Sequence, residues 1–568
     1  MRLNSRTTSA VKPSPQHRRH RSGVRRRRST TYCYDHRGNA IKKTQVTASS
    51  TYGVGYEYSL ADRLSAINYP DGARVEYTRD ALGRISAVKV RPTATGTLTS
   101  VISALTWQPF GPALTYSFAT GSQSLALAYD QNYWLTDVAG SVLNLHFCRD
   151  AVANITRLKT STPACTGTPT EQYAYDALYR LSQVQNGSGG VVEGYTYNLT
   201  GDRLSKTQGG ATTPYGYGSP LTRHRLLTVG SDTRDYDNAG NQMDGSTPGR
   251  TTTFDERNRF VQYAEPMNGW NATYNYNGRG ERVVKDAARM VPLGSSHAHF
   301  VYDESGQLLT DNGNSNPHPT DYIYADGRPV ALVRSGTIYY VHSDQLGTPR
   351  VVTAAGSATP IWNWAWQGNP FGEQQPVGPT FVMPLRFPGQ YADPESGLSY
   401  NYYRDYESGT GRYVESDVAG LKAGPATYEY AEDDPLTSAD WFGLASRNPQ
   451  PDYTSCAYYD AMYGKTHCCY YHLAARTCRG NNRLVNAWLF VLNVGAGQSN
   501  CIRPCLVDND KESLKDCHCR FGASGICNKP SCIDSYHNKC YAKCGSPTIA
   551  YGGNIIPLTW VVQTESCE

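Results

Sequence analysis

A nine-residue pattern that returns along the chain is the feature that most restricts its fold. Residues 77–85 have the form Tyr-x-x-Asp-x-x-Gly-Arg-apolar, and residues 173–181 repeat it as Tyr-x-Tyr-Asp-Ala-Leu-Tyr-Arg-Leu. Neighbouring copies lie about 20 residues apart, with 21 residues from Arg63 to Arg84. This spacing is typical of repeat architectures, in which each unit packs on its neighbours. Further copies begin at Tyr195, Tyr236, Phe254, Tyr276 and Tyr302.

Each unit is predicted to be a short antiparallel hairpin. Side chains alternate along a strand, so Tyr173 and Tyr175 place both rings on one face. The Asp or Asn that follows bonds local amides, and the Gly takes a positive φ, which makes a turn. The Arg-Leu or Arg-Ile step begins the returning strand. Because one hairpin cannot bury its own face, we expect a continuous antiparallel sheet over residues 31–444, wound about an axis and without a separate helical domain.

The composition agrees with a mainly β chain. The 568 residues include 43 Tyr and 53 Gly but only 12 Phe and 6 Met. Tyr favours strands and Gly favours turns. The repeated units resemble the YD repeats of the RHS family, which wind a β-sheet into a hollow shell around the C-terminal part of the same chain. The resemblance implies such a shell over residues 31–444, complete or incomplete, since about 400 residues is short for the family and residues 91–135 follow the pattern poorly.

A second block of motifs is more specific than the repeats. Residues 342–348 resemble the H-x-D-x-L-G-[ST] signature of the RHS family, and residues 386–391 and 400–406 continue the same block. Residues 339–444 are therefore identified as an RHS-associated core. His342 and Asp344 invite a catalytic interpretation. One His and one Asp between a strand and a Gly turn are better explained as a structural polar contact.

The core block ends in a motif that the family uses to cut its own chain. Residues 435–444 read Pro-Leu-Thr-Ser-Ala-Asp-Trp-Phe-Gly-Leu, which resembles the family's D-P-x-G-L terminus. The resemblance places a cut between Leu444 and Ala445. Trp441 stands where the family has Pro, which fixes the backbone of a loop in a way that Trp does not.

The same resemblance assigns the catalytic side chains. It gives Asp417 and Asp440 as the two acids and Arg404 as the nearby cation. Two acids held close do not both ionise easily, so the ionised one can activate water while the protonated one donates to the scissile carbonyl. The segment around Asp417 lacks the usual Asp-Pro. The alternative is that Asp440 is only a turn residue and the chain stays intact.

Residues 445–568 share neither the repeats nor the core motifs, and they hold thirteen of the 16 Cys. In the RHS family this position carries a variable toxin. We expect a small helical or α+β domain, stapled by disulfides in a protein that acts outside the cytosol.

Two other chemistries compete with a plain disulfide scaffold in this part. The three Cys and one His within residues 517–527 could hold zinc, although C-x-x-C pairs are missing. Residues 468–472 and the region of Asp534 and His537 are faintly similar to the Cys-Cys-x-x-His-Asp site of phospholipase A2, but no Asp follows either His. His472, His537 and Asp534 are therefore weak candidates for a toxin site, and neither a metal nor a cofactor is assigned.

The net charge of +5 belongs to one end of the chain. Residues 1–30 contain nine Arg, one Lys and no acid, so the other 538 residues carry −5. Such a tail is a disordered end, an extension from a misplaced start codon, or a contact for nucleic acid or a membrane surface. No apolar segment follows the charges as in a secretory signal, and no run reaches the ~18 to 20 apolar residues of a transmembrane segment.

The sequence thus predicts four parts: a basic tail (1–30), a YD-repeat shell (31–338), an RHS-associated core (339–444) and a Cys-rich effector domain (445–568). The predicted function is that of an RHS-type polymorphic toxin, which encloses its effector and releases it by aspartyl autoproteolysis after Leu444. The implied partners are a secretion-system spike or adaptor and a cognate immunity protein. Such a protein is cytoplasmic before export and is then secreted or delivered to a target cell.

Two alternatives remain open at this point. The first is a non-enzymatic secreted or surface protein that binds carbohydrate or protein through its Tyr-rich sheet, with a disulfide-rich cap. The second is a truncated gene product. The sequence does not decide whether the chain is an enzyme.

Overall fold

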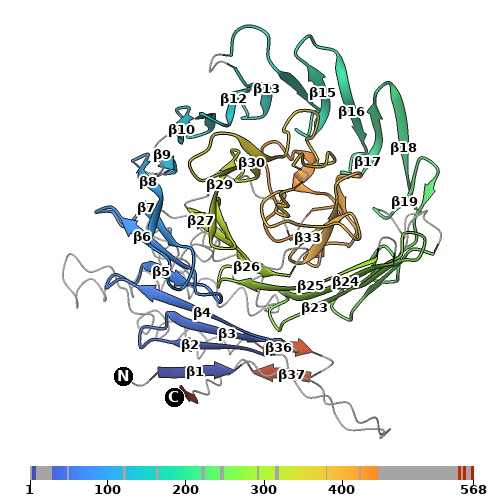
Figure 1. Ribbon diagram of the computed structural model, residues 1–568. Coiled ribbons are helices and arrows are strands. Elements are labelled where there is room, and N and C mark those ends of the chain that lie inside the picture. The colour runs from blue at the N-terminus through green and yellow to red at the C-terminus, as the bar shows by residue number, and fades with distance from the viewer. Residues whose placement is uncertain are drawn as a thin grey trace, which may run out of the picture. The chain divides into compact units, whose positions relative to one another are not determined.

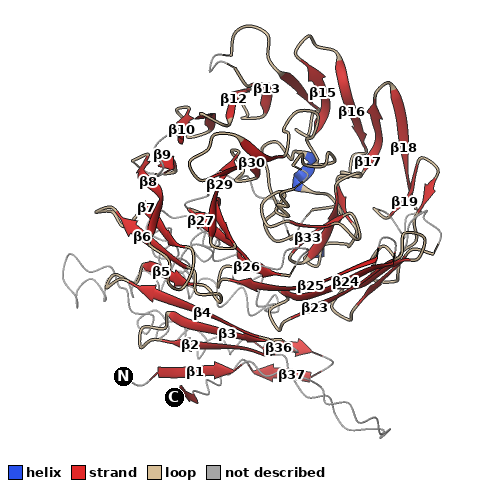
Figure 2. Ribbon diagram, in the orientation of Figure 1, coloured by secondary structure: helices blue, strands red, loops and turns tan. Residues whose placement is uncertain are grey.

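The computed structural model describes three parts of the chain: residues 3–7, residues 29–444 and, near the C-terminus, residues 548–551, 554–557 and 565–567. Within 29–444 the short segments 48–49, 110, 119–122, 162–164, 219–223, 244–248, 291–292, 314–318, 379 and 421–423 are not described. The chain divides into two compact units, residues 1–451 with 567–568, and residues 452–566. Strands dominate the described residues (Figure 2), which confirms the mainly β class.

The first sheet of the larger unit is an antiparallel meander in which each strand pairs with its neighbours in sequence. Its strands are β1 (Leu3–Thr7), β2 (Ser29–Tyr34), β3 (Ala40–Val46), β4 (Thr51–Tyr58), β5 (Leu64–Asn68), β6 (Arg74–Arg79), β7 (Ile85–Arg91), β8 (Thr99–Trp107), β9 (Ala113–Phe118), β10 (Gln123–Tyr129), β11 (Leu135–Gly140), β12 (Asn144–Arg149), β13 (Ile155–Lys159), β14 (Glu171–Tyr175), β15 (Leu181–Asn186), β16 (Val191–Tyr197), β17 (Arg203–Gln208), β18 (Ala211–Tyr217), β19 (Leu226–Val229) and β20 (Asp232–Thr233).

A second meander follows, and then a small sheet of the core block. The second sheet holds β21 (Thr251–Phe254), β22 (Phe260–Glu265), β23 (Trp270–Tyr276), β24 (Arg282–Met290), β25 (Leu293–Tyr302), β26 (Leu308–Asn312), β27 (Thr320–Ala325), β28 (Arg328–Arg334), β29 (Thr337–Ser343), β30 (Pro349–Ala354) and β31 (Pro360–Asn363). The small sheet holds β32 (Tyr391–Asp393), β33 (Leu398–Asn401), β34 (Arg404–Glu407) and β35 (Arg412–Tyr413), followed by the 3-10 helix η2 (Ala431–Asp433).

Near the C-terminus three further strands are described. β36 (Thr548–Tyr551) and β37 (Asn554–Pro557) form an antiparallel hairpin, and β38 spans Glu565–Cys567. No helix in the described parts of the chain is long and apolar enough to cross a membrane.

The repeated Asp or Asn makes the predicted turn. In each of these turns one side-chain oxygen accepts the amide hydrogens of the residues two and four positions later, and backbone hydrogen bonds across the same turn add to this closure. The Arg four residues after Asp80, Asp176 and Asp255 returns its Nε to the second carboxylate oxygen at 2.7 to 2.8 Å. Turns of this kind begin at Asp35, Asp80, Asp130, Asp150, Asp176, Asn186, Asn198, Asp255, Asn277, Asp303 and Asp344.

The Tyr just before the turn joins each hairpin to the previous one. Its hydroxyl donates to a backbone carbonyl 14 to 18 residues earlier, or 20 in one copy, at 2.7 to 3.1 Å. This contact links neighbouring units and gives a reason for Tyr at this position in seven copies, although Phe254 takes the position before Asp255. The donors are Tyr58, Tyr129, Tyr175, Tyr197, Tyr217, Tyr276 and Tyr324.

The prediction of one continuous sheet is wrong. Strand pairing stops between β20 and β21, and again between β31 and β32. At the first break the turn unit of Tyr236 contributes only a single bridge, to Gln242. The amide of Gln242 donates to the carbonyl of Val414 in the core block at 2.9 Å, while Met243 keeps single backbone hydrogen bonds to Asp235 on one side and Thr252 on the other. The poorly patterned residues 91–135 do continue the first meander, with register shifts in β8.

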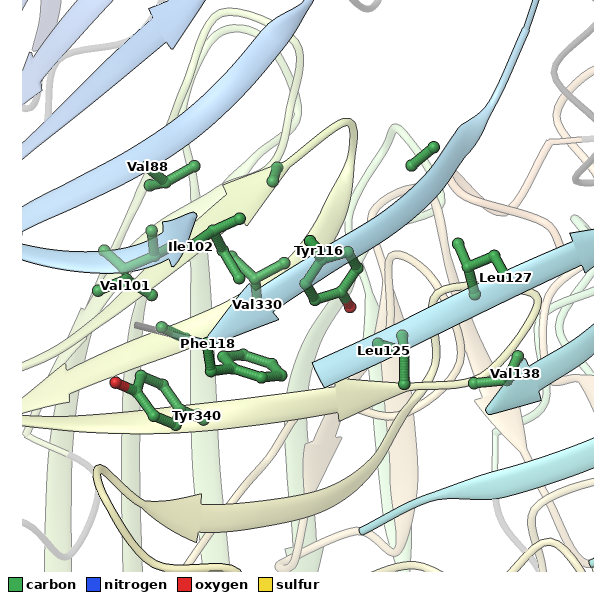
Figure 3. Close-up of a cluster of buried hydrophobic side chains, with 14 of the residues drawn as sticks. Val88, Val101, Ile102, Tyr116, Phe118, Leu125, Leu127, Val138, Val330 and Tyr340 are labelled. Carbon is green, nitrogen blue, oxygen red and sulfur yellow. The ribbon is translucent and has the colours of Figure 1, made fainter. Parts of the chain in front are cut away.

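Apolar side chains from the two large sheets pack together in the larger unit. Figure 3 shows part of this layer, in which the ring of Phe118 from β9 lies 4.6 Å from that of Tyr340 on β29. Val88 and Ile102 of the first sheet and Val330 of the second are buried in the same cluster. Side chains of this size contribute about 1.5–3 kcal/mol each when fully buried.

The second sheet also contacts the core block on its other face. Phe300 of β25 lies 5.0 Å from Tyr391 of β32, measured between ring centroids. Two buried cations of β24, Arg282 and Lys285, bind the carboxylate of Asp393, with Lys285 Nζ at 2.8 Å. Buried charges need such partners. In Figure 1 the strands of the first sheet follow one another along an arc around the orange segment that holds β33.

Candidate active site

The candidate site lies in the core block, where the small sheet meets the segment that ends at Leu444. Arg404 begins β34, and Asp417 follows shortly after β35. Asp440 lies in the last described turn of the core block. Sequence motifs separated by up to 36 residues thus supply the three side chains, and the strand pairing β33–β34–β35 brings them to one place.

The three predicted residues do come together. Nη2 of Arg404 lies 2.9 Å from Oδ2 of Asp417 and 3.0 Å from Oδ2 of Asp440. Their side chains are only 3, 1 and 2% exposed. The guanidinium of Arg404 lies 3.7 Å from the centre of the Tyr413 ring, and the Tyr413 hydroxyl donates to Oδ2 of Asp440 at 3.0 Å.

The two acids have different surroundings. Burial raises the pKa of Asp417; Arg404 opposes this rise, and the charge of Asp440 adds to it. Asp440 accepts hydrogen bonds from Arg404 and Tyr413 on one oxygen and from backbone amides on the other, a set of donors that suits a carboxylate. Burial, and then Asp440, raise the pKa of Tyr413, so its phenol stays a donor.

The segment before the predicted cut is held by several contacts. Oδ1 of Asp440 accepts the amide of Leu444 at 3.1 Å, and Nε of Arg404 donates to the carbonyl of Gly443 at 2.7 Å. Nδ2 of Asn401 donates to the carbonyl of Asp440 at 2.8 Å. Gly443 has a φ of +65°, and a Cβ there would lie 2.6 Å from the carbonyl oxygen of Asn401. These contacts fix the backbone from Asp440 to the amide of Leu444, on the N-terminal side of the Leu444 carbonyl.

Other sequence candidates lie elsewhere. Ala445, His472, His537 and Asp534 are outside the described residues, so the position of a toxin site stays a prediction.

His342 and Asp344, the other candidate pair from the sequence, make contacts within the fold and lie outside the cluster of Arg404. Asp344 makes a repeat-type turn and binds Nε of Arg350 at 2.7 Å. His342 lies 4.8 Å from the Phe118 ring, and burial lowers its pKa to about 4. Neither residue takes part in the Arg404 cluster.

Two members of the site, Tyr413 and Asn401, were not found from the sequence. Tyr413 ends β35, and Asn401 ends β33, two strands away in the small sheet. Their side chains meet at 2.7 Å, Nδ2 to Oη. Only the register of the small sheet shows that both face Asp440.

Comparison with known proteins identifies the chain's relatives. The sequence profile described as Teneurin YD-shell matches residues 126–431. The chain belongs to the Teneurin YD-shell family. Among solved structures, TcdB2-TccC3 without its hypervariable C-terminal region superimposes with a TM-score of 0.61 at 16% identity, over 73% of this chain and 24% of that one. A likeness at this identity shows a shared fold.

Curated relatives match over smaller shares of their own length. Double-stranded DNA deaminase toxin A of Burkholderia cenocepacia is 28% identical over 311 residues, which are 48% of this chain and 21% of the relative. Toxin protein Tse5 of Pseudomonas aeruginosa is 38% identical over 131 residues, 21% of this chain and 9% of the relative. Probable deoxyribonuclease RhsA of Dickeya dadantii is 25% identical over 432 residues, 69% of this chain and 26% of the relative. This chain therefore spans about a quarter or less of these proteins.

Proposed function

We propose that this YD-shell protein is the shell part of a polymorphic toxin, and that it cuts its own chain between Leu444 and Ala445 to free the Cys-rich region that follows. The observation that carries the proposal is the buried Asp417–Arg404–Asp440 cluster, whose contacts reach the amide of Leu444. The names of the relatives support a toxin, since two of the matched proteins are toxins.

The proposed reaction is a peptide hydrolysis in which one acid acts as the base and the other as the proton donor. Asp440, as carboxylate, takes a proton from water, and the water oxygen adds to the Leu444 carbonyl. Asp417, whose pKa is raised by burial, gives its proton to the developing oxyanion and then helps transfer it to the leaving amide. The C–N bond breaks, leaving a carboxyl on Leu444 and an amine on Ala445. Because the peptide is part of the same chain, no substrate-binding step is needed.

Denaturing mass spectrometry of the purified full-length chain tests the cut. The expected wild-type masses are those of residues 1–444 and 445–568. Asp417→Asn or Asp440→Asn should lower the rate by on the order of 10²–10⁴-fold, and the double variant should lose no more than either single one, because the acids act as a unit.

A matched control comes from the repeats. Asp176→Asn changes a repeat-turn acid that is also paired with an arginine, Arg180, but lies outside the cluster; it should leave cleavage unchanged. An intact wild-type mass would mean that Trp441 and the altered acid motif have disabled the protease. A cut that persists in both single Asn variants would assign it to other residues or another enzyme.

We further propose that residues 445–568 are the effector and that a delivery complex carries the shell to a target cell. The presence of a hypervariable C-terminal region in the TcdB2-TccC3 system supports this arrangement. Expression of residues 445–568 in bacteria, in the cytosol or exported to the periplasm, should arrest growth in one of the two compartments. Harmless expression in both would favour the alternative of a binding protein with a disulfide-rich cap.

A further inference from the structure

Strand β25 carries a His-x-His pair on the face opposite the core block. His297 and His299 flank Ala298, so both imidazoles point to the same side of the strand. Asp286 on β24 stands directly opposite His297 in the strand register. Ala298 and Phe300 point the other way, into the apolar layer against the core block.

The two imidazoles face each other through the same ring nitrogen. Nε2 of His297 lies 2.7 Å from Nε2 of His299, and the rings are nearly perpendicular at 82°. Nδ1 of His297 is hydrogen-bonded to a carboxylate oxygen of Asp286. Tyr52 of β4, in the first sheet, packs its ring 5.1 Å from that of His299. Both imidazoles are thus oriented, one by a carboxylate and one by an aromatic ring.

The hydrogen bonds orient the two rings towards a shared ligand position. The carboxylate of Asp286 holds Nδ1 of His297, so Nε2 of that ring faces His299. The ring of His299 is buried. Nδ1 of His299 has no hydrogen-bond partner in the described structure. In the metal-free protein one of the two facing Nε2 atoms carries the proton of their hydrogen bond. A bound ion would replace this hydrogen bond, and the unpartnered Nδ1 of His299 could then carry the proton of that ring.

We propose that His297 and His299 bind a divalent transition-metal ion such as Zn²⁺ through their Nε2 atoms, with Asp286 orienting His297. A carboxylate that holds the far nitrogen of a ligating histidine is the usual companion of such sites. Imidazole nitrogens suit Zn²⁺, Cu²⁺ and Ni²⁺. Asp286 holds the far nitrogen of His297, and water would supply the remaining ligands of the ion.

The geometry allows the ion to enter. Two nitrogens about 2.0–2.1 Å from a tetrahedral ion lie roughly 3.3 Å apart, so the rings must separate by about half an ångström. The side chains of His297 and Asp286 are 51 and 50% exposed, which leaves room for this movement and opens the site to solvent. Because His299 packs on Tyr52 of the first sheet, an occupied site would reinforce the seam between the two large sheets.

Zinc titration of the full-length chain by calorimetry tests the site, after removal of metal with EDTA and alkylation of the thiols, so that none of the 16 cysteines competes for zinc. The wild type should take up one equivalent that both His297→Ala and His299→Ala lose. Asp286→Asn should weaken binding by about 10–100-fold. His36→Ala removes an exposed histidine of the first sheet and should leave the titration unchanged. The Cu²⁺-loaded protein should show nitrogen hyperfine coupling from two imidazoles in its electron paramagnetic resonance spectrum.

Two results would overturn the proposal. One is a titration of His297→Ala that matches the wild type. The other is uptake that needs His297 but survives in folded His299→Ala, since that describes a single exposed imidazole. If His299→Ala fails to fold, His297→Ala still tests whether zinc uptake depends on this site, because the half-exposed side chain of His297 contributes little to packing. The spectrum of the Cu²⁺-loaded wild type then tests whether two imidazoles bind the ion.

Discussion

Replacing Arg404 by Met tests whether the cation organises the site. Met keeps much of the apolar stem but removes the charge shared by Asp417 and Asp440, at 2.9 and 3.0 Å. It also removes the donors to the carbonyls of Gly443 and Thr427. Breaking a buried ion pair from one side costs about 3–5 kcal/mol. We expect a loss of that order in the free energy of unfolding at neutral pH.

The loss should depend on pH in a defined direction. Burial already raises the pKa of Asp417 above its usual value, and Arg404 is the largest opposing influence. Without the cation that pKa rises further. An acid whose folded pKa lies above its unfolded value binds more protons when folded, so stability falls as pH rises towards the folded pKa. The deficit of Arg404→Met should therefore be largest near pH 8 and shrink as the pH falls towards 4.5 and Asp417 takes up a proton.

Cleavage should fall by on the order of 10²–10⁴-fold in Arg404→Met, which is about 3–5 kcal/mol in the barrier. The cleavage rate of Arg404→Lys should lie between those of the wild type and Arg404→Met, since Lys keeps the charge but lacks the planar guanidinium with its several donors. Arg350→Met, which removes a buried arginine from Asp344 outside the site, should lower stability and leave cleavage intact. Thermal unfolding by Tyr fluorescence from pH 4.5 to 8, with mass spectrometry for the cut, measures both. Wild-type cleavage in Arg404→Met, or a stability gap that does not change with pH, would refute this reasoning.

Three further changes probe the shell. Tyr197→Phe removes one hydroxyl that joins neighbouring hairpins and should cost about 1 kcal/mol in a denaturant titration; no loss would mean that the hydroxyl does not stabilise the register. Cys148→Ser removes the Cys148–Cys165 disulfide, whose cysteines lie 17 residues apart, and should cost about 3 kcal/mol in a denaturant titration without reductant; no loss would mean that this disulfide does not stabilise the shell. Burial raises the pKa of Asp405 to about 7, in a pair with Glu415, so wild-type stability should fall between pH 4 and 7; an unchanged slope in Asp405→Asn would contradict this.

The hairpin units could be predicted from the sequence because their contacts are local. Asp80 bonds the amides of residues 82 and 84 and the side chain of Arg84, all within four positions, so the pattern of residue types records the structure. The break after β20 could not be predicted in this way. The partner of Gln242 is Val414, far along the chain, and nothing in the local pattern marks that contact.

The Cys148–Cys165 disulfide could not be predicted from the sequence either, because it also depends on how the chain folds back. Cysteine density pointed to residues 445–568, and the few cysteines before them carried no pattern. Cys148 lies in β12 and Cys165 in the connection between β13 and β14, so they meet only because the chain turns back after β13. In the candidate site, motifs supplied Arg404 and both acids, whereas Asn401 and Tyr413 depend on strand register.

The turn of Asp440 is a repeat turn with one partner exchanged. As in the shell, one oxygen of Asp440 accepts the amides two and four positions later, here those of Phe442 and Leu444. In the repeats that begin at Asp80, Asp176 and Asp255 the second oxygen binds the Arg of the same turn, but at Asp440 it binds Arg404 from β34, which also holds Asp417.

This exchange explains how the segment keeps its conformation with Trp441 in place of the family's Pro. The side-chain oxygen and the amides hold the turn, so a fixed proline φ is not required. It also makes Asp440→Asn a selective change. Asn198 and Asn277 form the same turn in the shell, with both amides bonded to the side-chain oxygen. Asn at position 440 can therefore keep both amide bonds before Leu444, but its Nδ2 would face Arg404, whereas Asn198 and Asn277 donate to carboxylates. An unfolding curve of Asp440→Asn that matches the wild type would assign its loss of cleavage to the missing acid.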